Sequence, residues 1–127
     1  MLYLDSGGVI VLVESRARVA ELRRRGLWPA QVPAVVLAEA LTGDLRRDHG
    51  INRLLSTCQI RGVDELHGRE AGRLRASTGR AGTIAATDAL VVAMAAGHAD
   101  AVVLTSDPHD ITALAVHATR PVTVLAT

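Results

Sequence analysis

The sequence predicts an α/β fold of three layers (α/β/α), with a central parallel sheet of four to five strands. Short segments rich in Val, Leu and Ile alternate with longer segments whose apolar and charged residues recur at helical spacing. Hydrophobic residues make up 49% of the chain and aromatic residues only 2%, so small aliphatic side chains must form the core. Such a core suits strands covered by closely packed helices. With 127 residues, the chain is predicted to form a single domain, residues 1–127.

Five segments are predicted as strands because they are short, apolar and bounded by polar residues, glycine or proline. The first ends at Asp5, before Ser6 and two glycines. The fourth contains the apolar run AVVLT and has the clearest strand pattern. The predicted strands cover residues 1–5, 30–33, 59–63, 100–107 and 121–126.

Six segments are predicted as helices from their apolar spacing and end signals. Gly26 and Gly43 stand where glycine commonly follows a last helical turn, and Pro33 suits a first turn. Asp44 and Asp64 can each cap a helix start. The fifth segment is apolar on nearly every side, which predicts burial within a layer. The predicted helices cover residues 9–26, 33–43, 44–58, 64–80, 83–97 and 108–118.

Composition limits the classes of partner and compartment. The net charge is +1, so any contact with a polyanion must come from local patches among the 14 basic residues, all of which are arginine. Cys58 is the only cysteine, which excludes an internal disulfide and is compatible with a reducing cytosol. The start of the chain lacks a signal-peptide pattern and no apolar run is long enough for a membrane span. We therefore expect a cytoplasmic protein without a membrane partner.

Four carboxylates occupy positions where an acid is locally unexpected: Asp5, Glu39, Asp88 and Asp107. Asp5 and Asp107 end predicted strands, where parallel α/β folds collect their ligands. Glu39 follows two valines on one side of a short helix, where a buried carboxylate needs a partner. Asp88 begins the apolar run ALVVAMAA.

Structural roles are open for some of these acids. Asp107 precedes Pro108 and could simply cap a helix, with Asp110 completing a capping box. Asp88 could cap a helix that starts at Ala89, or Thr83 could cap it if the helix starts earlier. Taken together, however, four clustered acids repel one another and need a cation or protons, and the chain has no lysine to supply a counter-ion. Oxygen ligands favour Mg²⁺, or Mn²⁺, over zinc.

Four segments, LDSGGVI, VVLAEAL, ATDALVVAMA and VVLTSDPHDI, occur in this order over essentially the whole chain. In this respect the sequence resembles the PIN-domain nucleases, especially the VapC-like ribonuclease toxins of bacterial toxin–antitoxin modules. The resemblance implies a Mg²⁺-dependent endoribonuclease that hydrolyses RNA phosphodiester bonds. It also implies a homodimer that is held inactive by a cognate antitoxin covering its acidic pocket.

The resemblance also implies roles for individual residues. The acidic pocket would be formed by Asp5, Glu39, Asp88 and Asp107, with Asp5, Asp88 and Asp107 binding the metal. Ser6, Thr105 and Asp110 would be auxiliary polar groups. RNA contacts would come from some of the arginines: Arg23, Arg24, Arg25, Arg46, Arg47, Arg53, Arg69, Arg73 and Arg80. Solvated helix faces are the simpler explanation for most of these.

Two alternatives differ in class from a nuclease. One is phosphotransfer on an aspartate, but a receiver domain needs a lysine and a dehalogenase-type phosphatase needs a second Asp where Gly7 stands. The other is a catalytically weak module that binds RNA or protein. Gly7 and Gly8 allow two explanations as well: a tight strand-to-helix turn, or access of a phosphate to backbone amides at a helix start.

Overall fold

A computed structural model describes residues 1–127. Its centre is one sheet of five parallel strands in the order β3-β2-β1-β4-β5. All five predicted strands are present and the predicted parallel sheet is confirmed. The strands are β1 (Leu2–Leu4), β2 (Gln31–Pro33), β3 (Gln59–Arg61), β4 (Ala101–Thr105) and β5 (Val122–Ala126).

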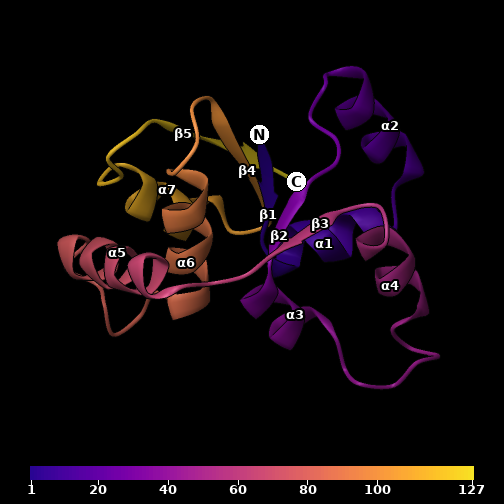
Figure 1. Cartoon of the computed structure of the whole chain (residues 1–127), viewed down its shortest axis with the longest axis horizontal. Helices are drawn as coiled ribbons and strands as arrows, with labels where there is room; N and C mark the ends of the chain where they lie inside the picture. Colours follow the sequence, from indigo (N-terminus) through magenta and orange to yellow (C-terminus); the bar gives the residue numbers. More distant parts are fainter.

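Helices cover both faces of this sheet, which confirms the predicted three layers. Figure 1 shows α5, α6 and α7 on one side of the strands and α1 to α4 on the other. None of the helices is long and apolar enough to cross a membrane. They are α1 (Ser6–Val13), α2 (Arg16–Arg24), α3 (Ala34–Ala40), α4 (His49–Leu55), α5 (Glu65–Ser77), α6 (Ala86–Ala95) and α7 (Pro108–Ala115).

The core is aliphatic, as the composition predicts. Leu2 and Leu4 of β1 are fully buried, and every residue from 91 to 96 at the end of α6 is buried. Helix α6 contacts β1, β2 and β4 as well as α5 and α7, so it lies in the middle of its layer. The predicted burial of this apolar segment is therefore confirmed.

The helix predicted over residues 9–26 is wrong in its extent, because two helices replace it. Helix α1 begins at Ser6, since the Asp5 side chain caps it. It ends before Ser15, whose hydroxyl accepts a hydrogen bond from the backbone N–H of Arg18 and caps α2. A side chain that caps a second helix thus interrupts a continuous helical pattern.

The helix predicted over residues 44–58 is also too long. The Asp44 carboxylate accepts hydrogen bonds from the backbone N–H groups of Arg46 and Arg47. Asp48 accepts hydrogen bonds from Thr42 and Gly43. These bonds fold the segment into a loop, and α4 begins only at His49.

The arrangement of β1 and β4 determines where a site can form. The two strands pair in parallel, with Leu4 opposite Leu104. From β1 the chain adds β2 and β3 on one side of the sheet, and it then returns to add β4 and β5 on the other side of β1. Such a switch point places the residues after both strands at the mouth of a crevice, where α/β sheets bind ligands.

Candidate metal centre

Asp5 lies at this switch point and is almost fully buried, with 4% of its surface exposed. It caps α1, and its Oδ1 accepts a hydrogen bond of 2.7 Å from the backbone N–H of Gly8. Burial raises the pKa of the Asp5 carboxyl, and the charges of Asp107 and Glu39 raise it further. Hydrogen bonds from Thr105 and Gly8 act in the opposite direction. Asp5 is thus a buried carboxyl whose pKa is raised by burial and by two neighbouring carboxylates.

Asp88 lies in the first turn of α6 and caps nothing. The N-cap residue is Ala85, which makes no side-chain capping bond, so both capping interpretations, by Asp88 and by Thr83, are wrong. The pKa of Asp88 is raised from 3.8 to about 6, mainly by burial and further by the negative charges of Asp5, Asp107, Glu39 and Asp110. The negative charges of all four other acids of the site therefore raise the pKa of Asp88.

Asp107 and Asp110 complete a compact group with Asp88. One carboxylate oxygen from each lies within 4.8 Å of the others. Asp107 also caps α7 by accepting a hydrogen bond of 3.4 Å from the Asp110 N–H, so the predicted cap is confirmed. The expected capping box does not form. The Asp107 N–H donates instead to the Thr105 hydroxyl (2.8 Å), and the Asp110 side chain pairs with Arg80.

Arg80 is a residue of this site that the sequence did not identify as a counter-ion. Its Nη2 lies 2.8 Å from Asp110 Oδ1. Arg80 belongs to the loop after α5, not to the helix itself, and its carbonyl oxygen accepts backbone hydrogen bonds from Thr83 and Ile84. Arg75 fixes the same loop through hydrogen bonds to the carbonyl oxygens of Ala81 and Ile84. The absence of lysine therefore does not leave the acids without a cation.

Glu39 lies near the end of α3, and its side chain is exposed, not on the core side of the helix. The expectation of a buried carboxylate was wrong, because the buried side of α3 consists of Val36 and Ala40, four residues apart, and Glu39 lies outside it. Glu39 nevertheless lies close enough to raise the pKa of both Asp5 and Asp88. We therefore count Glu39 as one of the acids of this site.

The remaining predicted polar groups lie beside the acids. Thr105 is fully buried at the end of β4, and Ser6 is the first residue of α1. A Cβ on Gly8 would come within 2.5 Å of the Leu104 carbonyl oxygen, and one on Gly7 would overlap the Ser106 hydroxyl. Close packing of α1 against the end of β4 therefore accounts for both glycines, an explanation that the sequence did not suggest.

The donor set fits a hard divalent cation. Asp88, Asp107 and Asp110 offer three carboxylate oxygens within one small volume, and no histidine or cysteine belongs to the group. Oxygen ligands of this kind suit Mg²⁺ or Mn²⁺. Asp5 is not one of these three, although its charge interacts with Asp88. The geometry thus adds Asp110 to the group from which metal ligands would be drawn.

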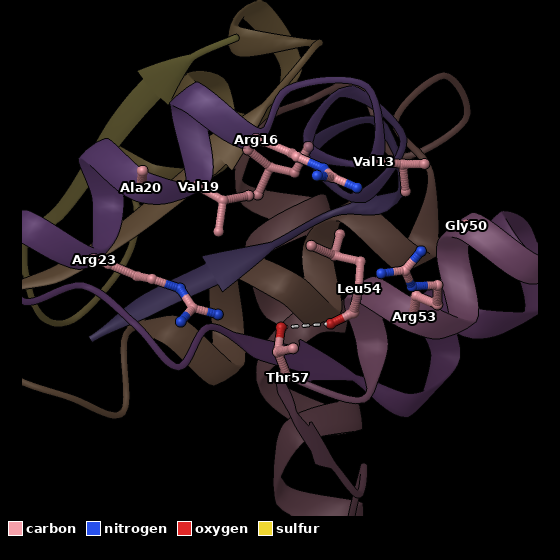
Figure 2. A pocket seen from close by; sticks show the side chains of 10 residues that line it. Val13, Arg16, Val19, Ala20, Arg23, Gly50, Arg53, Leu54 and Thr57 are labelled. Atoms are coloured by element: carbon pink, nitrogen blue, oxygen red, sulfur yellow. Dashed lines mark hydrogen bonds between the residues drawn. The ribbon is translucent and has the colours of Figure 1, made fainter.

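A separate groove of about 410 Å³ lies between α1, α2 and α4 (Figure 2). Leu12, Val13, Val19 and Leu54 contribute apolar surface to it. Arg16, Arg23 and Arg53 also line it, and none of them forms an ion pair with a carboxylate. The Arg23 guanidinium lies 5.8 Å from the ring centre of Trp28. The groove therefore combines apolar surface with unpaired positive charge.

No family model and no curated protein matches the chain. Solved structures do match over nearly its whole length. VapBC2 from Rickettsia felis bound to promoter DNA has a TM-score of 0.73 and 15% identity, covering 100% of this chain and 99% of that chain. DNA-bound VapBC from Salmonella typhimurium gives 0.72 and 16%, covering 98% and 96%. FitAcB from Neisseria gonorrhoeae gives 0.67 and 23%, covering 97% and 96%. The chain therefore has the PIN-like three-layer α/β/α fold, and its predicted resemblance to VapC-like proteins is confirmed at the level of the fold.

Proposed function

We propose that this chain is a Mg²⁺-dependent endoribonuclease and the toxin of a type II toxin–antitoxin system, with residues 1–127 as one nuclease domain. The observation that carries the proposal is the group of acids at the switch point between β1 and β4. Asp88 receives the field of four other carboxylates there, and three of the acids offer ligand oxygens within 4.8 Å. Carboxylates this close repel one another, so the group lowers the stability of a metal-free protein. A bound divalent cation would offset that repulsion.

The residues have distinct tasks in this proposal. Asp5, Asp88 and Asp107 would hold Mg²⁺, or Mn²⁺, with Asp110 as a further ligand. When bound, the ion would neutralise charge on the phosphodiester and make hydroxide available near neutral pH. Glu39 is exposed and close to these acids, so it can orient or deprotonate the attacking water. Thr105 fixes the backbone at Asp107 through its 2.8 Å hydrogen bond, and Ser6 completes the polar surroundings.

The test compares RNA cleavage by the wild type and Asp5→Asn in the presence of Mg²⁺. We expect the variant to lose cleavage, since a neutral amide at this buried position weakens metal binding while it can still cap α1. Asp100→Asn is the matched control. It removes an exposed carboxylate at the opposite end of β4, and asparagine tolerates the positive φ of 56° there. Equal cleavage by Asp5→Asn and the wild type would contradict the proposal.

The cognate antitoxin is the partner that we propose for the groove of Figure 2. Unpaired arginines beside apolar side chains fit a segment that carries both carboxylates and apolar residues. We expect the variant Arg16→Glu to lose binding to the antitoxin, because it places a negative charge in the groove. RNA cleavage by that variant should persist, because Arg16 does not lie among the acids. Unchanged binding in calorimetry would contradict this assignment.

A homodimer and a cytoplasmic location belong to the same proposal. The support for both is the predicted family resemblance. Light scattering on the purified chain would test the dimer, and fractionation of the source cells would test the location.

A further inference from the structure

A second cavity, of about 490 Å³, lies at the other end of α6 from the acids. Asp88 is in the first turn of α6, and His98 follows its last turn, ten residues later. The helix ends at Ala95, seven residues after Asp88, so its last residue lies roughly 10 Å from Asp88 along the helix axis at 1.5 Å per residue. The cavity is thus separate from the candidate metal centre. Its lining includes Tyr3, Arg61, His67, Met94, Gly97 and His98.

A buried phenol forms part of this lining. Tyr3 is only 1% exposed, and its hydroxyl lies 2.9 Å from His98 Nε2. Burial raises the pKa of Tyr3, while the charge and hydrogen bonding of Arg61 oppose the shift. Tyr3 is the only tyrosine of the chain. Its contact with His98 brings a hydroxyl and an imidazole together beside the cavity.

The electrostatic surroundings are positive. Burial lowers the pKa of His98, and the charges of Arg61, the N-terminal ammonium and Arg120 lower it further. Arg120 donates a 3.0 Å hydrogen bond to the carbonyl oxygen of Gly97, so it is held beside the cavity. Arg61 pairs with no carboxylate. Its guanidinium interacts with the Tyr3 hydroxyl but has five N–H donors, so donors remain for a ligand with acceptor oxygens.

His67 adds a donor to the same lining. Its Nδ1 accepts a hydrogen bond from the backbone N–H of Asp64, as part of the capping box of α5. The hydrogen of the neutral ring therefore sits on Nε2, which is left to donate. Asp64, the acid next to His67, accepts the His67 backbone N–H with its Oδ1 (2.9 Å). Donors and positive charge thus outweigh acceptors in this cavity.

We propose that this cavity is a binding site for a phosphate group, carried either by RNA or by a free mononucleotide. Arg61, His67 and His98 supply the recognition, with Tyr3 positioning His98. A guanidinium can donate two parallel hydrogen bonds to phosphate oxygens, and imidazole N–H groups can donate further ones. The volume exceeds that of a phosphate alone and lies within the range of small-molecule sites. Phosphate binding in this cavity requires neither metal nor cleavage, so it does not depend on the proposed nuclease activity.

The experiment is a titration followed by amide NMR on the full chain in EDTA, which removes divalent metal and prevents RNA cleavage. AMP, inorganic phosphate and a short single-stranded RNA are added separately at low salt. We expect saturable shifts of the Gly62 and Gly97 amides, which both line the cavity. Shifts with AMP or phosphate assign a free ligand, and shifts with RNA alone assign nucleic acid.

Two variants make the result specific. Arg61→Gln should weaken binding roughly tenfold, the effect of one charge-assisted hydrogen bond. Arg18→Gln removes a charge that already pairs with Glu21 on α2, and it should bind as the wild type does. The spectrum outside the cavity reports whether each variant is folded. No saturable shift with any of the three ligands, or equal binding by Arg61→Gln, would overturn the proposal.

Discussion

At the scale of single residues, Asp88 makes the metal-free protein sensitive to pH. Its pKa is about 6 in the folded chain against the ordinary value of 3.8, because it is buried among other acids. Between these pH values the folded state holds a proton that the unfolded state has lost. The stability contributed by this proton is fully present below pH 3.8 and is lost as the pH rises through about 6.

Asp88→Asn should therefore flatten this pH dependence. Asparagine does not titrate, so the variant should lose less stability than the wild type between about pH 5 and about pH 7.5. The measurement is the thermal midpoint of both proteins in EDTA at each pH. Titrating groups that do not interact with Asp88 contribute equally in the two proteins and cancel in the comparison, so the difference reports on Asp88 and the acids around it. Parallel curves for wild type and variant would show that Asp88 does not carry the effect.

Arg80 should compete with a divalent cation for Asp110. The ion pair of 2.8 Å occupies one of the three carboxylates that lie within 4.8 Å of one another. In Arg80→Gln the carboxylate is released and the site becomes more negative by one charge. We expect Mn²⁺ to bind several-fold more tightly to this variant in calorimetry.

Arg73→Gln is the control for Arg80→Gln, because Arg73 pairs with Glu70 on the exposed face of α5. It removes the same charge from the molecule as a whole but should leave Mn²⁺ affinity unchanged. Weaker Mn²⁺ binding by Arg80→Gln would mean that the guanidinium supports the site instead of competing for it.

The acids at this site differ in how well the sequence predicts them. Asp5 and Asp107 follow apolar strands, and the pairing of Leu4 with Leu104 brings them to one edge of the sheet. The role of Arg80 could not be predicted, because its partner Asp110 is 30 residues away and contact depends on the path of a loop. The spacing of residues along a helix predicts which side chains share a face. It does not predict which side chain of a distant loop will contact that face.

At the scale of secondary-structure elements, the start of α1 depends on glycine. A Cβ on Gly8 would lie 2.5 Å from a backbone oxygen of β4, and backbone cannot move aside as a flexible side chain can. Gly8→Ala should therefore destabilise the protein by about 1–3 kcal/mol, the usual range for overpacking. Urea unfolding would measure the loss.

Gly72→Ala on α5 is the matched comparison. An added Cβ at Gly72 meets nothing within 4 Å, and the position lies inside an exposed helix. Alanine should stabilise the protein there by about 0.5–1 kcal/mol. If Gly8→Ala were as stable as the wild type, α1 would not be packed against β4 as closely as the structure indicates.

Element boundaries are the part of the fold that the sequence predicts least well. In the second half, the helices that follow Asp64 and Asp107 begin where they are predicted to begin, because both aspartates act as caps. The helix predicted over residues 83–97 is shorter, Ala86–Ala95. The first half differs where side chains hydrogen-bond to backbone groups. Ser15 divides one predicted helix, and Asp48 holds the loop before α4. Both residues are compatible with a continuous helix in sequence, so only the three-dimensional contacts distinguish the outcomes.

At the scale of the whole molecule, the alternation of strands and helices predicts the parallel sheet and its two covering layers. It does not determine the strand order, which comes from how each helix packs after its strand. The observed order places the switch point between the first and fourth strands, so residues from both ends of the chain meet there. The acidic group is thus a property of the topology, and its repulsion acts against the folded state as a whole.

Divalent metal should consequently stabilise the entire fold. A cation that binds the folded chain alone adds about 2.7 kcal/mol when its concentration is 100 times the Kd, which is a rise of several degrees in Tm. Mn²⁺ and Mg²⁺ should produce this rise in a thermal scan, whereas K⁺ at matched ionic strength should not. Asp107→Asn should abolish the rise without breaking α7, because asparagine caps helices as well as aspartate does. A wild-type Tm that stays constant up to millimolar metal would contradict the metal centre itself.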